Sequence, residues 1–230
     1  GHIEKLKEIS SEKGLPFDAG LTRVVLPHIV TLKIVDIEGN FALPEKSHVP
    51  SRRYLAYGSS ITHGQTSIRP AGSYAMRTAE HLGVDLINLG FGGGAHCERQ
   101  MAEYIAERQD WDFASLELGI NMCSFEVEGF QKRVEYFIPA IVKAHPNKYI
   151  FCIDIFTCNM DLEKNFEKQN IFRKIVKEVV AGCGSDKVIH IDGRDILKSV
   201  NGLAVDLVHP SPAGMEEMAL NLSGIIKRYI

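Results

Sequence analysis

The sequence predicts an α/β protein in which helices pack on both faces of a parallel β-sheet. From residue 53 onward, short apolar runs of strand length alternate with longer amphipathic stretches of helical period. The short runs are closed by turn-forming residues such as Gly, Asn or Thr. We therefore expect a single three-layer α/β/α sandwich with five parallel strands, together with a short N-terminal β appendage.

The expected strands are four to seven residues long and rich in Leu, Ile, Val or aromatic side chains, a composition typical of buried strands. Because parallel strands need crossover connections, each should be followed by a helix that packs back onto the sheet. The strands are expected at Tyr54–Tyr57, Asp85–Leu89, Phe113–Leu118, Tyr149–Ile155 and Val188–Ile191.

The expected helices lie between these strands and after the last one. Before the fifth strand, for example, Ile171, Ile175 and Val179 recur at the spacing of one helix face. The last helix should begin at Ser211-Pro212, because Ser can cap a helix and Pro suits its first position. The other helices are expected at Tyr74–Leu82, Glu98–Arg108, Glu128–Ala144 and Leu162–Val180.

The first fifty residues have a different pattern. Leu21–Leu26 and Ile29–Ile37 resemble two β segments, and Ile3–Ile9 has the pattern of a short amphipathic helix. Two strands cannot form an independent core. Residues 1–50 should therefore pack on the main domain, residues 51–230, or be what remains of a larger β-sandwich.

Composition and charge exclude several classes of function. The 230 residues are 45% hydrophobic and 24% charged, which is ordinary for a globular protein. A net charge of -3 argues against a nucleic-acid partner, and no apolar stretch is long enough to span a membrane. Five scattered cysteines form neither a disulfide framework nor a zinc motif, which favours a reducing cytoplasmic compartment. Because the chain opens on Gly1 rather than Met, secretion after loss of a signal peptide is the alternative. The oligomeric state is not indicated.

Chemically capable residues follow the predicted strands. In open parallel sheets, ligands bind at the carboxyl ends of the strands, so segments that follow different strands can meet at one edge. Three such segments follow the first three strands, and a fourth precedes the last helix. They are Gly58–Gly64, Gly90–Gly94, Gly119–Asn121 and Asp206–Pro210.

Together these segments supply the groups that acyl transfer requires. Ser60, in a turn between a strand and a helix, is the candidate nucleophile, and His209 is the candidate base. Asp206 lies three residues before this histidine and would hold the imidazole in the required tautomer. The backbone N–H groups of Ser60 and Gly93 and the amide of Asn121 are candidate donors to the oxyanion.

Gly92 and Gly94 compete with Gly93 for that role. His63 and Arg69, close to the nucleophile in sequence, are candidate substrate-binding residues. The expected partner is a small acyl ester, and the polar character of these neighbours favours a short acyl chain on a polar, sugar-like alcohol.

The segments resemble, in their order and spacing, the four sequence blocks of the SGNH, or GDSL-like, hydrolases. The resemblance extends from about Arg53 to the C-terminus and is strongest to a bacterial branch that often carries an N-terminal β-sandwich. It implies a flavodoxin-like fold, a serine esterase or acylhydrolase that needs no cofactor, and the roles assigned above. In one departure, Ser59 stands where the family name has Asp. The blocks are Gly58-x-Ser60, Asn88-x-Gly90-x-Gly92-Gly93, Gly119-x-Asn121 and Asp206-x-x-His209.

Other readings of these residues explain less. An acyltransferase would use the same site, and a non-catalytic carbohydrate-binding module would leave it without a role. Gly90-x-Gly92-x-x-Ala95 also satisfies the dinucleotide-binding fingerprint, with Glu117 as the acidic residue, but that reading leaves the serine and histidine unexplained.

Two further candidates concern metals and thiols. His96 beside Cys97 is a poor pair of metal ligands, so no metal site is expected. Cys123 is a conceivable nucleophile, but its position after Asn121 favours a place in the pocket wall.

Overall fold

The computed structural model describes residues 1–15, 19–27, 30–162 and 167–230. Its centre is a five-stranded sheet, and all five predicted strands are present to within two residues at each end. Each strand pairs with its neighbours in parallel. The strands are β1 (Arg53–Gly58), β2 (Asp85–Gly90), β3 (Phe113–Glu117), β4 (Tyr149–Ile153) and β5 (Val188–Ile191).

The order of the strands across the sheet is β2-β1-β3-β4-β5. The chain moves outward from β1 to β2 and then returns across β1 to begin β3, so the direction of winding reverses between β1 and β3. In sheets of this kind, the reversal opens a crevice at the carboxyl ends of the two strands, and ligands bind there. The segment that carries Ser60 follows β1, and the segment that carries Asn121 follows β3.

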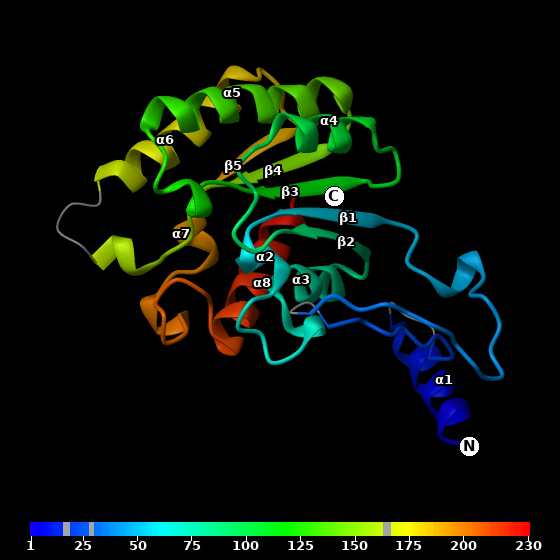
Figure 1. The fold of residues 1–230 in the computed structure, drawn as a ribbon. Helices are drawn as coiled ribbons and strands as arrows, with labels where there is room; N and C mark the ends of the chain where they lie inside the picture. The colour runs from blue at the N-terminus through cyan, green and yellow to red at the C-terminus, as the bar shows by residue number, and fades with distance from the viewer. Residues whose placement is uncertain (16–18, 28–29, 163–166) are drawn as a thin grey trace.

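Helices cover both faces of the sheet, which confirms the three-layer sandwich (Figure 1). Helices α4, α5 and α6 cover one face, and α3, α7 and α8 lie on the other, with the short α2 at the end of β1. Their bounds are α2 (Ser60–His63), α3 (Tyr74–Leu82), α4 (Arg99–Glu107), α5 (Val127–Ala144), α6 (Glu167–Gly182), α7 (Gly193–Ile196) and α8 (Pro212–Ile226).

The predicted helices agree with these bounds. The helix expected at Tyr74–Leu82 has those ends, capped by the side chain of Ser73 and by Gly83 in the left-handed conformation. Helix α8 is capped by Ser211 and has Pro in its first turn, as expected. The stretch predicted as one helix over Leu162–Val180 contains α6, while residues 163–166 lie outside the described residues.

Two apolar clusters hold the layers together, one on each face. The cluster under α4, α5 and α6 includes Trp111, Phe130 and Phe172. The rings of Phe130 and Phe172 stack with their centroids 4.0 Å apart. The cluster under α3 and α8 includes Tyr74 and Phe156. Because apolar side chains are buried on both faces, the strands are rigid supports for the loops at their ends.

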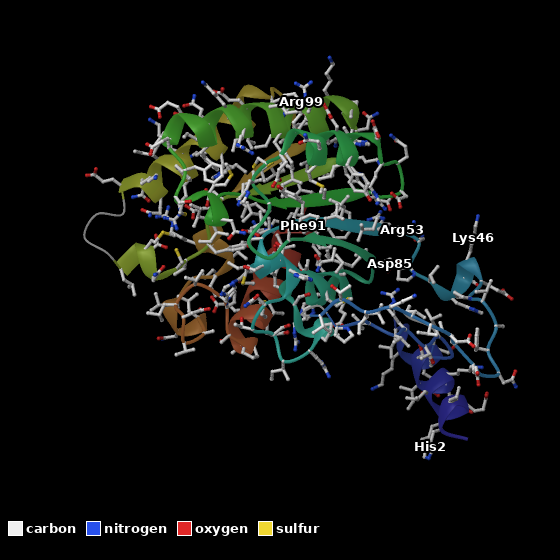
Figure 2. The ribbon with its side chains drawn as sticks, viewed as in Figure 1. His2, Lys46, Arg53, Asp85, Phe91 and Arg99 are labelled. Atoms are coloured by element: carbon white, nitrogen blue, oxygen red, sulfur yellow. The ribbon has the colours of Figure 1, made fainter. Side chains whose placement is uncertain are left out.

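The two ends of the strands differ in character (Figure 2). Arg53 and Asp85 stand at the amino ends of β1 and β2, where their side chains approach to 3.9 Å. Phe91 lies at the opposite edge, directly after the carboxyl end of β2. The candidate catalytic segments lie at this second edge.

The predicted β appendage does not form as strands. Helix α1 (His2–Lys13) contains the expected helix over Ile3–Ile9. Neither Leu21–Leu26 nor the described part of Ile29–Ile37, residues 30–37, is a strand. Large apolar side chains along residues 24–43 are exposed, so the alternating pattern has no partner strand here to satisfy its backbone groups or cover its apolar side.

Candidate active site

Ser60 is the first residue of α2, directly after the carboxyl end of β1. The side chain of Ser59 caps the helix by accepting a hydrogen bond from the Ile61 N–H at 3.1 Å. As the first helical residue, Ser60 has an N–H group with no acceptor inside the helix. The short helix then ends at Gly64, which has φ of 109°. The turn therefore presents both the hydroxyl and the N–H of Ser60 at the edge of the sheet.

Ser59 thus has a role of its own at the position of the family's Asp. Serine is among the residues best suited to cap a helix, because its short side chain reaches the free N–H groups of the first turn. Although position 59 is Ser rather than the Asp of the family name, its side chain still caps the turn that carries Ser60.

Two glycines allow the backbone around this turn to come very close. A Cβ atom on Gly90 would lie 2.2 Å from the backbone nitrogen of His63, so β2 could not approach α2 with any larger residue. Asn88 strengthens the same contact: its amide donates to the carbonyl of Thr62 at 3.0 Å, and its side-chain oxygen accepts from the Gly90 N–H at 2.8 Å. Asn88 and Gly90 thus fix the position of α2 against the end of β2.

His209 lies on a loop that precedes α8 and is held by backbone hydrogen bonds. Leu203 and Pro210 form an antiparallel bridge, and the Ala204 N–H donates to the carbonyl of His209 at 2.7 Å. Between them the chain turns through Leu207, which has a positive φ of 55°. The hydroxyl of Thr66, from the loop after α2, donates to the carbonyl of Pro210 at 2.7 Å. The histidine loop is therefore tied directly to the nucleophile loop.

Ser60, His209 and Asp206 form a hydrogen-bonded triad. The Oγ of Ser60 lies 2.8 Å from Nε2 of His209, and Nδ1 of His209 lies 2.7 Å from Oδ2 of Asp206. Because an ionised carboxylate can only accept, Nδ1 carries the proton, and Nε2 is left to accept from the serine hydroxyl. The structure thus brings together three residues that are up to 149 positions apart in the sequence.

The Asp206 carboxylate is well supplied with donors. Partial burial favours a higher pKa, but hydrogen bonds from the Val208 N–H and from the His209 ring and N–H outweigh it and lower the pKa of Asp206. At neutral pH the group is therefore ionised and able to orient the imidazole.

The candidate oxyanion donors lie on two neighbouring loops. Asn121 is in a 3₁₀ turn (Ile120–Met122) after β3, and its amide donates to the carbonyl of Gly94 at 2.7 Å. This bond joins the loop after β3 to the glycine loop after β2. The Gly94 N–H is already bonded to the carbonyl of Phe91, at 3.1 Å, which removes Gly94 as a free donor. Gly93 has φ of 70°, and a Cβ there would meet open space.

The other candidate residues are His63 and Arg69, which follow Ser60 in the sequence, and Cys123, which follows Asn121. His63 is the last residue of α2, one turn after Ser60, and is half-buried. Arg69 is exposed on the loop that follows. Cys123 is half-buried, and its thiol donates to the carbonyl of Gly119; burial raises its pKa to about 12, so it remains a thiol at neutral pH.

The structure after β2 does not agree with the interpretation of the glycine run as a dinucleotide-binding motif. That fingerprint needs a helix to open directly on the glycine run, so that the helix N-terminus faces the pyrophosphate. Here an irregular loop from Phe91 to Glu98 separates β2 from α4.

One residue beside the nucleophile was not predicted from the sequence. Glu117, the last residue of β3, is only 2% exposed, and its carboxylate accepts hydrogen bonds from the Ser59 N–H and the Thr62 hydroxyl. The signal was an acidic residue at the end of an otherwise apolar strand, immediately before Leu118 and the Gly119-x-Asn121 segment.

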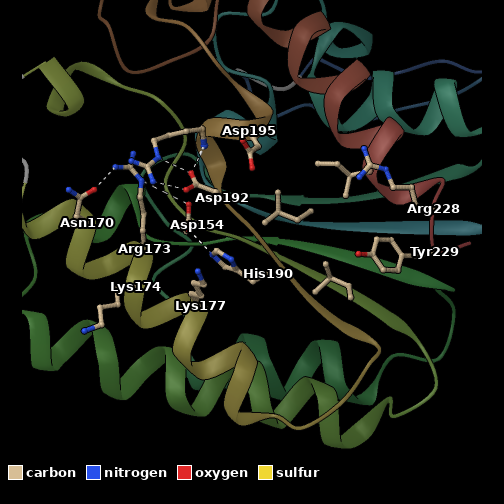
Figure 3. A pocket seen from close by; sticks show the side chains of 14 residues that line it. Asp154, Asn170, Arg173, Lys174, Lys177, His190, Asp192, Asp195, Arg228 and Tyr229 are labelled. Carbon is tan, nitrogen blue, oxygen red and sulfur yellow. Dashed lines mark hydrogen bonds and ion pairs between the residues drawn. The ribbon is translucent and has the colours of Figure 1, made fainter.

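A hollow of about 730 Å³ lies elsewhere, beside β5 and α6 (Figure 3). At its floor, Asp154 accepts from Nε2 of His190 at 2.8 Å and from the Gly193 N–H at 2.7 Å. Arg173 forms a two-pronged ion pair with Asp161 and also donates to the carbonyl of Ile155. These charged groups bond to one another and to backbone, which ties β4, β5, α6 and α7 together.

The described residues contain neither a metal-binding cluster nor a membrane-spanning helix. No three side chains of His, Cys, Asp or Glu gather there in a way that could hold a metal ion. Nor does any helix in the described ranges combine the length and the apolar character needed to cross a membrane.

A parallel sheet with the order 2-1-3-4-5 and a Ser–His–Asp triad at its carboxyl edge define a class of α/β hydrolytic enzymes. The sequence model of the GDSL-like Lipase/Acylhydrolase family matches residues 51–227, and the chain belongs to this family, as its sequence motifs predicted.

Solved structures agree on the fold. A putative GDSL-like lipase from Bacteroides ovatus ATCC 8483 is 22% identical with a TM-score of 0.69, over 79% of this chain and 54% of that one. The salicylyl-acyltransferase SsfX3 from a tetracycline biosynthetic pathway is 21% identical with a TM-score of 0.69, over 81% and 57%. A family two carbohydrate esterase from Clostridium thermocellum, in complex with cellohexaose, is 20% identical with a TM-score of 0.62, over 82% and 66%. The chain thus spans little more than half the length of the first two. No curated protein matches it.

Proposed function

We propose that this protein is a serine esterase that cleaves acyl esters through a covalent acyl-enzyme. The observation that carries the proposal is the continuous contact from Ser60 through His209 to Asp206, with bonds of 2.8 and 2.7 Å. A serine hydroxyl alone is a weak nucleophile, and a neutral imidazole within hydrogen-bonding distance is the group that activates it.

In the first half of the reaction, the Ser60 oxygen attacks the ester carbonyl carbon while its proton moves to Nε2 of His209. The carbonyl oxygen becomes an oxyanion, which the N–H groups of Ser60 and Gly93 and the amide of Asn121 would hold. Collapse of this intermediate breaks the bond to the alcohol oxygen, which leaves with the proton from His209. In the second half, His209 takes a proton from water, and the hydroxide attacks the carbonyl carbon of the acyl-enzyme. The bond to the Ser60 oxygen then breaks, His209 returns its proton to that oxygen, and the acid is released.

We propose a short acyl chain on a polar, sugar-like alcohol as the substrate class. His63 and Arg69, the candidate substrate-binding residues, offer polar groups for such an alcohol. A structural neighbour named as a carbohydrate esterase was solved with cellohexaose, which is consistent with a sugar-like substrate. A panel of acetate, butyrate and octanoate esters, together with acetylated sugars, tests this preference.

The proposed reaction is tested by replacing Ser60 with Ala and by labelling with a fluorophosphonate. The wild type should hydrolyse a chromogenic acetate ester and accept the label at one serine, and Ser60→Ala should lose both. Ser185→Ala is a matched control, because that serine lies just before β5 and its hydroxyl, among the described residues, bonds only the nearby Lys187 N–H. Activity that survives in Ser60→Ala contradicts the proposal.

Acyl transfer to an acceptor other than water is the second candidate. It is favoured by the similarity of the fold to an acyltransferase, with a TM-score of 0.69. Both reactions share the acyl-enzyme and differ only in the group that attacks it. Adding sugar and small-alcohol acceptors separates them, since a transferase gives a new ester without release of the free acid.

A further inference from the structure

Glu117 is a buried carboxylate that the Ser–His–Asp chemistry does not use. It ends β3, on one side of the crevice between β1 and β3, and reaches across to the turn on the other side. Its Oε2 accepts from the Ser59 N–H at 2.5 Å and from the Thr62 hydroxyl at 3.0 Å. These two donors flank Ser60 in the sequence, so a single oxygen atom holds both sides of the nucleophile turn.

The direction of the hydrogen bonds shows that this oxygen is an acceptor in a chain of three groups. The Thr62 hydroxyl also lies 2.7 Å from the hydroxyl of Tyr74, which is fully buried in α3. Since Thr62 has one hydrogen and gives it to Glu117, Tyr74 must donate to Thr62. The chain from Tyr74 through Thr62 to Glu117 thus connects α3, α2 and β3.

The last residue of β1, Gly58, must lack a side chain for this carboxylate to fit. A Cβ on Gly58 would lie 2.3 Å from Oε2 of Glu117 and 2.2 Å from the hydroxyl oxygen of Thr62. The glycine of the Gly58-x-Ser60 motif is therefore required by the contact between Glu117 and Thr62, as well as by the turn itself.

The Glu117 carboxyl is 2% exposed, and burial raises its pKa above the usual value. The hydrogen bonds from the Ser59 N–H and the Thr62 hydroxyl act in the opposite direction and offset part of that effect.

We propose that Glu117 is a positioning residue of the active site: its carboxylate holds the Ser60 turn in place from β3 through the Ser59 N–H and the Thr62 hydroxyl. The proposal rests on the esterase activity proposed above. Two substitutions at this position test it, one that removes the acceptor oxygen and one that keeps it.

Glu117→Ala removes both the acceptor and the charge. We expect kcat to fall by roughly 10²-fold with little change in KM, because a small displacement of a reacting group has an effect of this size. Glu117→Gln keeps an acceptor oxygen at the end of a side chain of the same length. Its kcat should therefore recover to within a few-fold of wild type.

The matched control is Ser115→Ala. Ser115 lies two residues earlier on the same face of β3, is fully buried, and shares a 2.5 Å hydrogen bond with the Tyr54 hydroxyl. Its loss should lower stability without changing kcat. A folded Glu117→Ala with wild-type kcat overturns the proposal, and so does a folded Glu117→Gln whose kcat is as low as that of Glu117→Ala. A wild-type protein with no esterase activity would instead contradict the proposed function.

Discussion

The described residues include two Asp–His pairs with almost the same hydrogen-bond distance, and only one of them also contacts a serine hydroxyl. Asp206 and His209 are 2.7 Å apart, and Asp154 and His190 are 2.8 Å apart. His209 bonds Asp206 through Nδ1 and contacts Ser60 through Nε2, whereas His190 bonds Asp154 through Nε2. No hydroxyl in the described residues bonds the second ring nitrogen of His190. A third group therefore decides whether such a pair can do chemistry.

The two pairs also differ in burial. Asp154 is 1% exposed and lies among the Gly193 N–H, the Arg173 guanidinium and His190, while Asp206 is exposed on its loop. A buried carboxylate with several partners stabilises the elements around it, because removing it leaves those partners unpaired. An exposed one can be replaced at little cost to the fold. We therefore expect the Asp206–His209 pair to matter for rate and the Asp154–His190 pair for stability.

The largest expected effect separates the two histidines. His209→Ala should lower kcat by roughly 10⁶-fold, because it removes the base that activates Ser60. His190→Ala, the matched variant in the other pair, should keep kcat within about threefold. Hydrolysis of a chromogenic acetate ester measures both. Equal losses of kcat in the two variants would contradict the different roles expected for the two Asp–His pairs.

Asp206→Asn should lower kcat by about 10⁴-fold, because an amide can hold the imidazole in the wrong tautomer. Its urea midpoint should remain close to that of wild type, since the side chain is exposed. The same kinetic assay and an unfolding curve measure the two properties. A large loss of stability with retained activity would reverse the roles assigned to the two carboxylates.

Asp154→Ala should lower the free energy of unfolding by about 1–3 kcal/mol, because it leaves the buried Gly193 N–H and Nε2 of His190 without their acceptor. The folded fraction should retain its kcat. Urea denaturation followed by circular dichroism gives the stability, and active-site titration with a fluorophosphonate gives the folded fraction. An unchanged unfolding midpoint would contradict the structural role of this pair.

The pH dependence of stability should have opposite signs for the two carboxylates. The pKa of Asp206 is lowered in the folded protein, so its contribution to stability is present above pH 4 and is lost as the pH falls through the folded pKa. The pKa of Asp154 is raised, chiefly by burial and despite its bonds to His190 and Gly193, so its contribution is present at low pH and lost as the pH rises through the folded pKa.

Unfolding curves at pH 3 and pH 7 test this contrast. On going from pH 7 to pH 3, the stability of wild type relative to Asp206→Asn should fall, and its stability relative to Asp154→Asn should rise. Shifts of the same sign in both comparisons would contradict it.

The smallest effect is expected at the N-terminus. We propose that residues 1–50 form a unit separate from the main domain, and their described contacts with that domain include an ion pair between Arg23 and Asp85 at the amino edge of the sheet. A chain of residues 51–230 should therefore keep kcat/KM within about twofold on small esters. A large loss of activity in the folded, shortened chain would place this segment in the active domain.

Much of the fold could be predicted because each strand and helix carries its own pattern. The strands beside Tyr57 and Leu89 are short apolar runs closed by Gly, and the helix after Ser211 begins with a cap and a proline. The β segment over Leu21–Leu26 failed for the opposite reason, since an alternating pattern forms a strand only beside a partner. Local pattern is sufficient for elements that bury their own apolar face and insufficient for those that depend on a neighbour.

The sequence by itself determined the elements, their order, and the candidate roles of Ser60, His209 and Asp206, because motif spacing and apolar period are properties of the chain alone. Only the tertiary structure decided which Asp–His pair meets a hydroxyl, and that Glu117 holds the nucleophile turn. The reason is physical: hydrogen bonds between residues 58 or 149 positions apart depend on distances of a few tenths of an ångström, which follow from how the layers pack.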